Sequence, residues 1–329
     1  MSNYKDIHGT QIEVRSDNPS NPVNGQVWYN TTDNKLRGLA SNPVGSWATG
    51  GSLNLGREQN TGLSVGTQTA GLIFGGDNPT PGGTVKTEEY NGSSWTESGN
   101  MNTSRRGGAG YGTQTSAMSG ASFAGNTGET DKTETYNGST WTEIADLNAA
   151  RAYAAGAGAN NTSGLFFGGN DGSNNIAINE SYNGTCWAEV ANLNTARNGL
   201  SGIGTGTSAL AFSGNSGSVT GITEIWNGSG WTETADMNTA RSNAGGAGVN
   251  STSALVYGGY TTAYVAVTEE WNGTSWSEVA DISTVRSAGG SSGTAASALY
   301  SGGQNPAGKV TTTEEWSQPA LTIREFDLS

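Results

Sequence analysis

Short runs of alternating apolar and polar residues recur along most of the chain, separated by clusters of Gly, Asn, Ser and Thr. Between residues 106 and 147, four such runs are RGGAGYG, SAMSGASFAG, KTETY and WTEIADL. Short alternating runs bounded by turn residues are typical of half-buried β-strands, and no long helical pattern is present. We therefore predict an all-β protein with four short strands in each such stretch.

The stretch is one of six copies of a single phrase. The phrase has a hydrophobic-Asn-x-x-Arg step, a run of small residues, an apolar strand ending near Gly-Gly, and Glu-x-aromatic-Asn-Gly-x-x-Trp; residues 237–276 are the clearest copy, and the sixth copy departs most from it. The aromatic residue before the turn recurs every 44 to 46 residues, at Tyr90, Tyr136, Tyr182, Trp226, Trp271 and Trp316. A fixed period of this size is typical of repeat folds, in which a residue common to all copies serves the fold.

Asn-Gly pairs lie between the third and fourth predicted strands. Asn137-Gly138 predicts a tight hairpin turn, because both residues tolerate positive φ. The same pair recurs at Asn91, Asn183, Asn227 and Asn272. These sites also fit the glycosylation sequence, but the N-terminal MSNYKDIHGT lacks the apolar core of a secretory signal, which favours the turn.

Four antiparallel strands per copy predict the blade of a β-propeller, with the Gly/Ala-rich first strand nearest the axis. The sixth copy has no second Trp after Trp316, and the missing residue occurs at Trp47, 48 residues before Trp95. We predict that the N-terminal strand completes the last blade. The result is a closed, six-bladed ring over residues 44–316 without an open sheet edge.

The repeat resembles the kelch motif over about residues 44–316. The resemblance rests on these residues: the apolar run into Gly258-Gly259, Trp271, Trp276 and the step from Met237 to Arg241. It implies a kelch-like propeller and says little about activity. The Asn-Gly-Ser/Thr-x-Trp turn, together with Gly-Thr-Gln-Thr at Gly66 and Gly112, is similar to the kelch-like proteins of marine tailed bacteriophages.

Residues 1–43 lie outside the repeat. The stretch NPVNGQVWYNTTDNKLRGL resembles a short hairpin near the start of phage tail-fibre and other virion proteins, which implies a virion-attachment module. TQIEVRS and the C-terminal ALTIREFDL alternate apolar and polar residues. We expect residues 317–329 to pack on this module as a strand, the alternative being a frayed tail.

Composition restricts the chemistry. The net charge of −13 disfavours nucleic acid as a partner, no apolar run is long enough to insert into a membrane, and the single cysteine, Cys186, forms no internal disulfide. The single histidine, His8, precedes the repeats, which excludes the copper chemistry of kelch-type oxidases. We expect no metal, no cofactor and no catalytic residue.

One arginine and one glutamate recur in every copy. The arginines are Arg57, Arg105, Arg151, Arg197, Arg241 and Arg286, and the glutamates are Glu88, Glu134, Glu180, Glu224, Glu269 and Glu314. Sialidases gather three arginines around a carboxylate, but one arginine per copy and the lack of an Asp-box motif favour structural ion pairs or backbone contacts. The alternative is a ring of arginines at the channel mouth that binds an anionic group.

The loops between the second and third strands differ among copies and emerge beside the arginine-bearing connections. Because variable loops on a rigid scaffold commonly carry binding residues, they supply the candidates. These are Asp77, Asn78, Arg106, Asp131, Lys132, Asn170, Asp171, Tyr260 and Tyr264. Tyr, Asn and Asp suit sugars by ring stacking and by hydrogen bonds to hydroxyls; solvated loop residues are the alternative.

Our functional hypothesis is a non-enzymatic structural protein of a phage virion, at the fibre, tail or capsid periphery. It would assemble in the host cytoplasm with other virion proteins and present a face to a host-surface glycan or protein. The alternatives are a decoration or adaptor protein that binds another virion protein, and a glycan hydrolase. A homo-oligomer stays open, because no coiled-coil heptads impose one.

Deletion of residues 1–50 tests the predicted closure. Removing the N-terminal strand should expose a sheet edge and cause aggregation, measured by light scattering and thermal unfolding. A soluble product as stable as the full chain would refute the closure.

Overall fold

The computed structural model of the chain describes residues 12–20, 26–39, 45–58, 61–62, 66–78, 82–318 and 323–326. These parts contain strands and no helix. They form two compact units, one from Met1–Gly45 and Gln318–Ser329 and the other from Ser46–Ser317. The all-β prediction is confirmed for the described residues.

The larger unit contains six four-stranded sheets whose neighbouring strands are antiparallel. In sheet order their strands are β5 (Thr61–Gly62), β6 (Leu72–Phe74), β7 (Thr87–Tyr90) and β8 (Trp95–Glu97); β10 (Ala109–Thr113), β11 (Ser116–Gly120), β14 (Glu134–Tyr136) and β15 (Trp141–Glu143); β16 (Ala155–Asn160), β17 (Ser163–Phe167), β18 (Asn179–Tyr182) and β19 (Trp187–Val190); β20 (Ser201–Thr205), β21 (Ser208–Phe212), β22 (Thr223–Trp226) and β23 (Trp231–Glu233); β24 (Gly245–Asn250), β25 (Ser253–Tyr257), β26 (Thr268–Trp271) and β27 (Trp276–Val279); and β28 (Gly290–Thr294), β29 (Ser297–Ser301), β32 (Thr313–Ser317) and β4 (Ser46–Thr49). Each sheet corresponds to one copy of the repeat, numbered 1 to 6 in chain order. Short extra strands on the loops are β9 (Arg105–Arg106), β12 (Ser122–Ala124), β13 (Glu129–Thr130), β30 (Gln304–Asn305) and β31 (Gly308–Lys309).

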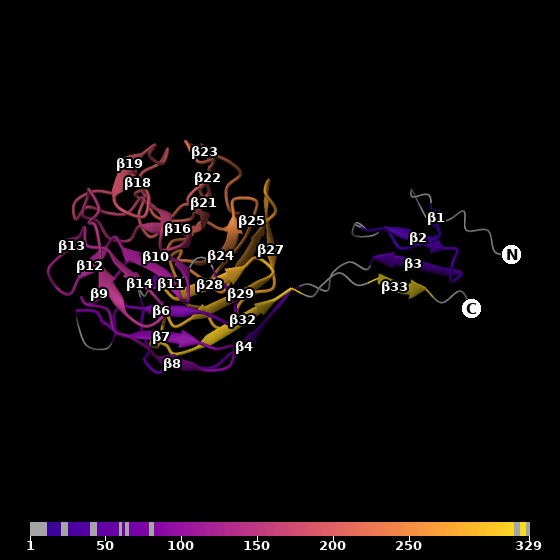
Figure 1. Ribbon diagram of the computed structural model, residues 1–329, viewed down its shortest axis with the longest axis horizontal. Helices are drawn as coiled ribbons and strands as arrows, with labels where there is room; N and C mark the ends of the chain where they lie inside the picture. Colours follow the sequence, from indigo (N-terminus) through magenta and orange to yellow (C-terminus); the bar gives the residue numbers. More distant parts are fainter. Residues whose placement is uncertain are drawn as a thin grey trace. The chain divides into compact units, whose positions relative to one another are not determined.

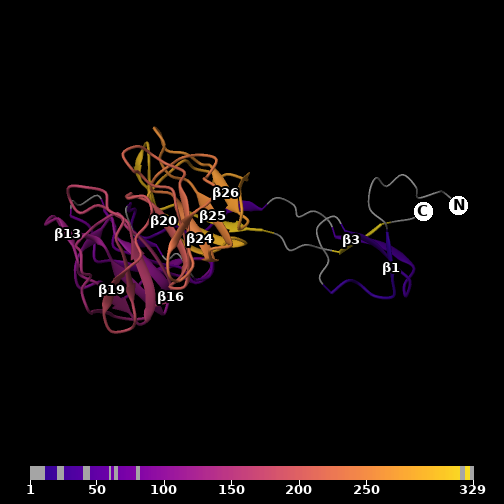
Figure 2. The ribbon, with the colours of Figure 1, turned by 90° about the horizontal axis from the view of Figure 1, so that it is seen from above.

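The first strands of the sheets contact one another in chain order, and β5 also contacts β28. The six sheets lie around a common centre (Figure 1), and β16, β20 and β24 lie side by side (Figure 2). Small residues permit this approach: a Cβ added to Gly156 would lie 3.0 Å from the Gly110 carbonyl oxygen of the preceding copy. The arrangement is β-propeller-like.

The sheet of copy 6 obtains its fourth strand from the N-terminal side of the chain. In this sheet β4 pairs with β32, and Trp47 stands opposite Trp316. Copy 6 also contacts copy 1 directly: Gly303 N donates to the Arg57 carbonyl at 2.8 Å, and Trp95 Nε1 donates to Thr313 Oγ1 at 2.9 Å.

The same kinds of contact join other neighbouring copies. Gly169 N donates to the Arg197 carbonyl at 2.9 Å, and Trp141 Nε1 donates to Thr87 Oγ1 at 2.9 Å. The junction of the last copy with the first is therefore built like the junctions between consecutive copies.

Large aromatic side chains fill the space between neighbouring sheets. The Trp that opens each fourth strand packs on the aromatic residue that closes the third, as in the Tyr136–Trp141 pair, with ring centroids 5.0 Å apart. It also contacts the preceding copy: the Trp141 ring lies 4.6 Å from Phe74, and Trp47 lies 4.8 Å from Tyr257. These residues form the core clusters between the sheets.

The Asn-Gly pairs lie in the hairpin turns predicted between the third and fourth strands. In the first, Tyr90 pairs with Trp95 across a loop of four residues. Gly92 has φ of +90°, and the Asn91 side chain accepts hydrogen bonds from Ser93 N at 3.0 Å and Ser94 N at 2.9 Å. The glycine thus supplies the positive φ, and the asparagine caps the loop with its side chain.

A buried glutamate connects the start of each copy to its third and fourth strands. In copy 2, Glu134 Oε2 accepts from Asn102 N at 2.8 Å and Asn102 Nδ2 at 2.9 Å, while Oε1 accepts from Arg105 Nε at 3.1 Å. Asn102 Nδ2 also donates to the Trp141 carbonyl at 3.1 Å. The hydrophobic-Asn-x-x-Arg step and the Glu-x-aromatic-Asn-Gly-x-x-Trp segment are thus two halves of one hydrogen-bonded unit.

The network recurs with one substitution. The other ion pairs are Arg57–Glu88, Arg151–Glu180, Arg197–Glu224, Arg241–Glu269 and Arg286–Glu314. In copy 6 the Asn is replaced by Ser283, whose backbone N alone donates to Glu314 Oε2, at 2.7 Å. Each of these side chains is at most 1% exposed, and burial lowers the pKa of Arg57, Arg151, Arg197 and Arg241. Buried charges of this kind are tolerated only as pairs, because either partner alone would be an uncompensated charge.

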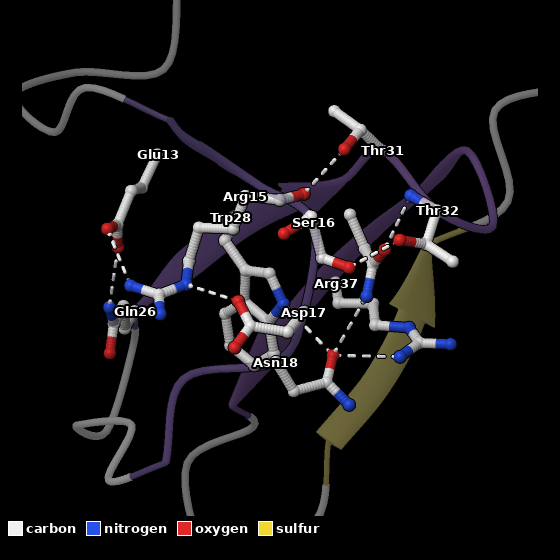
Figure 3. Close-up of polar contacts among 11 residues, drawn as sticks. Glu13, Arg15, Ser16, Asp17, Asn18, Gln26, Trp28, Thr31, Thr32 and Arg37 are labelled. Atoms are coloured by element: carbon white, nitrogen blue, oxygen red, sulfur yellow. Dashed lines mark hydrogen bonds and ion pairs between the residues drawn. The ribbon is translucent and has the colours of Figure 1, made fainter.

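The smaller unit is a four-stranded sheet of β1 (Glu13–Arg15), β2 (Val27–Asn30), β3 (Lys35–Leu39) and β33 (Ile323–Phe326). The C-terminal β33 pairs with β3, while β1 pairs with β2 in parallel. Asn18 holds the segment after β1: its Oδ1 accepts from Trp28 Nε1 at 3.2 Å and Arg37 Nη1 at 2.8 Å (Figure 3). The two ends of the chain thus contribute to one sheet.

Glu224→Gln tests the buried pairs. The change preserves shape but leaves Arg197 charged and buried without its carboxylate, so we expect a loss of about 3–5 kcal/mol in the free energy of unfolding, measured in urea. Glu233→Gln is the matched control, because Glu233 is exposed opposite Glu224 on the neighbouring strand and should change stability by about 0.5 kcal/mol or less. Equal losses in the two variants would contradict the structural role.

Candidate functional site

The recurring arginines do not line a channel mouth. Each guanidinium lies inside its own copy, at most 1% exposed and directed at the third-strand glutamate. They are therefore not at the channel mouth, which was the alternative considered from the sequence, because each side chain turns inward to its glutamate. No anionic ligand can reach these six side chains in this structure.

In each copy the second-to-third loop pairs with the segment after the arginine, and the paired residues vary between copies; some are accessible, whereas Ala152, Ser242 and Ser287 are buried. We call these residues the loop triplet: the residue after the repeat arginine, the loop residue paired with it, and a third residue paired with the second. The triplets are Arg106, Phe123 and Glu129; Ala152, Asn170 and Asn175; Asn198, Asn215 and Val219; Ser242, Tyr260 and Tyr264; and Ser287, Gln304 and Lys309. In copy 1 the first two positions are Glu58 and Asp77.

The triplets of copies 6 and 1 meet at the junction of the ring. Lys309 Nζ lies 2.9 Å from Asp77 Oδ2 and 3.8 Å from Glu58 Oε1, and it donates to the Asn78 carbonyl at 2.7 Å. With its amide oriented to satisfy both groups, Gln304 donates to Glu58 Oε1 at 2.8 Å. We call these residues, with the tyrosines of copy 5 described next, the junction cluster.

Tyr260 and Tyr264 extend the junction cluster. Their rings meet edge to face with centroids 5.4 Å apart, and Tyr260 is 39% exposed. Burial raises the pKa of Tyr264, and the charge of Glu58 raises it further. Burial also raises the pKa of Glu58, while Lys309 acts in the opposite direction. The cluster therefore combines an accessible aromatic pair with carboxylate, amide and ammonium groups.

The other predicted residues lie apart from the junction cluster. Asn170 belongs to an amide chain in which Asn175 Oδ1 accepts from Asn170 Nδ2 at 3.2 Å and from Asn198 Nδ2 at 2.6 Å. Asp171 caps its own turn by accepting from Ser173 N and Asn174 N, which lowers its pKa.

Asp131 and Lys132 are not part of a loop triplet. The Asp131 carbonyl accepts from Leu147 N at 2.9 Å, and Lys132 Nζ lies 2.6 Å from Asp146 Oδ2 on the outer surface. The sequence analysis named Asp77, Asn78, Tyr260 and Tyr264 as separate loop candidates. It did not predict that they belong to one cluster.

Several members of the triplets escaped sequence reasoning. These are Glu58, Phe123, Glu129, Gln304 and Lys309. A usable signal was present, because the first triplet position always follows the repeat arginine and the second follows the pair that is Gly-Gly in four copies.

The described residues show no group of three or more His, Cys, Asp and Glu side chains that could hold a metal ion. Among them, no helix is long and apolar enough to cross a membrane. Cys186 is an exposed free thiol. His8 lies outside the described residues.

Comparisons with known proteins inform the fold. No family model and no curated protein matches the chain. Among solved structures, one titled "Structure of YjhT" matches with a TM-score of 0.68 at 13% sequence identity, covering 84% of this chain and 99% of that chain. At this identity the likeness concerns the fold alone, and it agrees with the propeller-like arrangement of the sheets.

Lys309→Met tests the electrostatics of the junction cluster. A carboxyl group whose pKa is raised on folding destabilises the folded state once the pH exceeds its pKa in the unfolded chain, about 4.3 for Glu. Because Lys309 opposes the rise in the pKa of Glu58, removing Lys309 makes this destabilisation larger. We expect a loss of about 1–3 kcal/mol at pH 7 that becomes smaller near pH 3.5, where protonation of Glu58 removes its charge.

Urea unfolding at the two pH values measures this difference. Lys86→Met, which removes an exposed lysine paired with Glu97, should be near neutral at both pH values and serves as the control. A loss for Lys309→Met that does not depend on pH would contradict an electrostatic role.

Proposed function

We propose that the chain is a six-bladed, kelch-like β-propeller closed by its N-terminal strand, and that its loop face recognises a saccharide without chemical conversion. Closure is supported by the pairing of β4 with β32 and by the contacts between copies 6 and 1. The kelch-like character is supported by the sequence of the repeat.

One observation carries the binding proposal: the triplets of three copies bring unlike, accessible polar and aromatic groups together at the junction cluster. The groups common to all copies are buried and paired within the scaffold. A rigid ring that presents unequal loops is a common design for a binding protein.

The chemistry of the junction cluster suits a sugar. The exposed Tyr260 ring can stack on the apolar face of a pyranose, while Glu58, Asp77 and the Gln304 amide offer acceptors and donors for hydroxyl groups. Lys309 pairs closely with Asp77, at 2.9 Å, and lies 3.8 Å from Glu58, so these carboxylates are held in an ion-paired cluster that can accept hydrogen bonds from hydroxyl groups.

For the biological setting, we propose a component of a phage virion that meets a host-surface glycan. This proposal rests on the resemblance of the repeat and of residues 21–39 to phage virion proteins. The smaller unit, which has its own sheet, would be the attachment module.

Tyr260→Ala and Tyr264→Ala test the recognition surface. We expect a glycan bound by the full chain on an array of bacterial surface glycans to lose at least about tenfold in affinity in each variant, equivalent to about 1.4 kcal/mol. Val249→Ala is the matched control, because Val249 is an apolar residue of similar exposure, 42%. It lies near the end of β24 that is farther along the chain from Ser242, the residue paired with Tyr260.

Thermal unfolding of the variants separates loss of binding from loss of fold. Retention of full affinity by both tyrosine variants would move recognition away from the junction cluster. No binding to any glycan, or release of product from one, would overturn the proposed function.

A further inference from the structure

Arg106 differs from every other cation whose side chain the structure describes. All the other described Lys and Arg side chains form an ion pair. Arg106 has no ion pair and no side-chain hydrogen bond with a described residue, and its Nε is buried without a partner. Its neighbour Arg105 is a scaffold arginine with a glutamate and two further acceptors.

The local sheet places Arg106 on an aromatic platform. Phe123 pairs with Arg106 on one side and with Glu129 on the other, so the three side chains share one face of the β13-β12-β9 sheet. The Arg106 guanidinium carbon lies 4.7 Å from the centroid of the Phe123 ring. Stacking holds the guanidinium plane against the ring while its edge stays available for hydrogen bonding.

Tyr153 of the next copy completes the platform. Its ring meets Phe123 edge to face with centroids 5.2 Å apart. Tyr153 has φ of +56°, a conformation that non-glycine residues rarely adopt, and its N donates to the Gly107 carbonyl at 2.7 Å. A Cβ on Gly107 would lie 2.9 Å from the Tyr153 ring and 3.3 Å from the Phe123 ring. The same positive φ and the same hydrogen bond recur at Gly199, Asn243 and Ala288, so the scaffold fixes the backbone here and the Tyr153 side chain is what this copy adds to the platform.

We propose that Arg106 binds the carboxylate of an acidic sugar whose ring packs on Phe123 and Tyr153. The guanidinium fork matches a carboxylate with two parallel hydrogen bonds, and aromatic rings suit the C–H face of a pyranose. Glu129, which has no hydrogen bond or ion pair with a described residue, is placed across Phe123 to accept a sugar hydroxyl.

The net charge of the chain restricts which acidic saccharides can bind. At −13 the protein repels polyanions, so an isolated uronate on an otherwise neutral chain fits better than a polyuronate. This inference rests on the proposed saccharide recognition and names a second contact, in copies 2 and 3, separate from the junction cluster.

The experiment is calorimetric titration of the full chain with uronate-bearing probes and their carboxyl-reduced forms. The probes are a xylo-oligosaccharide with one glucuronate, which should bind the more tightly, and a hyaluronan hexasaccharide, which carries a glucuronate in every disaccharide and serves as the polyuronate for comparison. We expect at least one probe to bind, its reduced form to bind at least about tenfold more weakly, and Arg106→Gln to lose the same factor for the acidic form only. Arg106→Lys keeps the charge but loses the guanidinium fork, so its affinity for the acidic probe should lie between those of the wild type and Arg106→Gln. Lys86→Gln removes the same charge elsewhere and should bind like the wild type.

The outcomes separate this inference from the proposed function. Equal binding by Arg106→Gln, equal binding of the reduced probes, binding of an acidic peptide in place of the sugars, or no binding of either probe would overturn the Arg106 site. If array glycans still bind in a Tyr260-dependent manner, the proposed function stands without it. If no glycan of any kind binds, both fail.

Discussion

A buried glutamate on the third strand makes the interaction on which the fold of each copy depends. Glu134, for example, accepts hydrogen bonds from Asn102 and Arg105 of its own copy, and Asn102 in turn holds the carbonyl of Trp141. The carboxylate thus links the entry segment, the third strand and the fourth strand without contact with solvent. Because a buried charge must be paired, every copy has both partners. The recurring arginines and glutamates therefore serve the fold.

The same constraint separates recurring residues from residues that vary. Arg105 and Arg106 are adjacent in the chain, yet one is an ion-paired scaffold residue and the other stacks on Phe123 without a carboxylate. The strand register produces this contrast, since successive residues of a strand point to opposite faces. In other copies the residue after the arginine is buried as well, as at Ala152, Ser242 and Ser287, so the position is fixed by the repeat but its exposure is not.

Much of this organisation is visible in the sequence. The period, the four strands per copy and the transfer of Trp47 to the last copy follow from hydrophobic patterning, and the regular spacing of arginine and glutamate indicates that they pair. Burial of those pairs was not predictable, because it depends on which way each arginine turns. The junction cluster was not predictable either: Glu58 and Lys309 come from opposite ends of the repeats and meet only when copies 1 and 6 become neighbours. The Asn-Gly hairpins were predictable, but not the capping of the loop by the Asn91 side chain.

The pairing of the N-terminal strand with the last copy joins these observations, since it brings copies 1 and 6 together and assembles the junction cluster. Hydrogen–deuterium exchange of the full chain, followed by mass spectrometry, tests it most directly. Those backbone amides of Ser46–Thr49 that face Thr313–Ser317 should be protected from exchange, because the two strands form one ladder and β4 is its edge. Exchange of Ser46–Thr49 at the rate of an unstructured peptide, with Thr313–Ser317 protected, would contradict a closed ring.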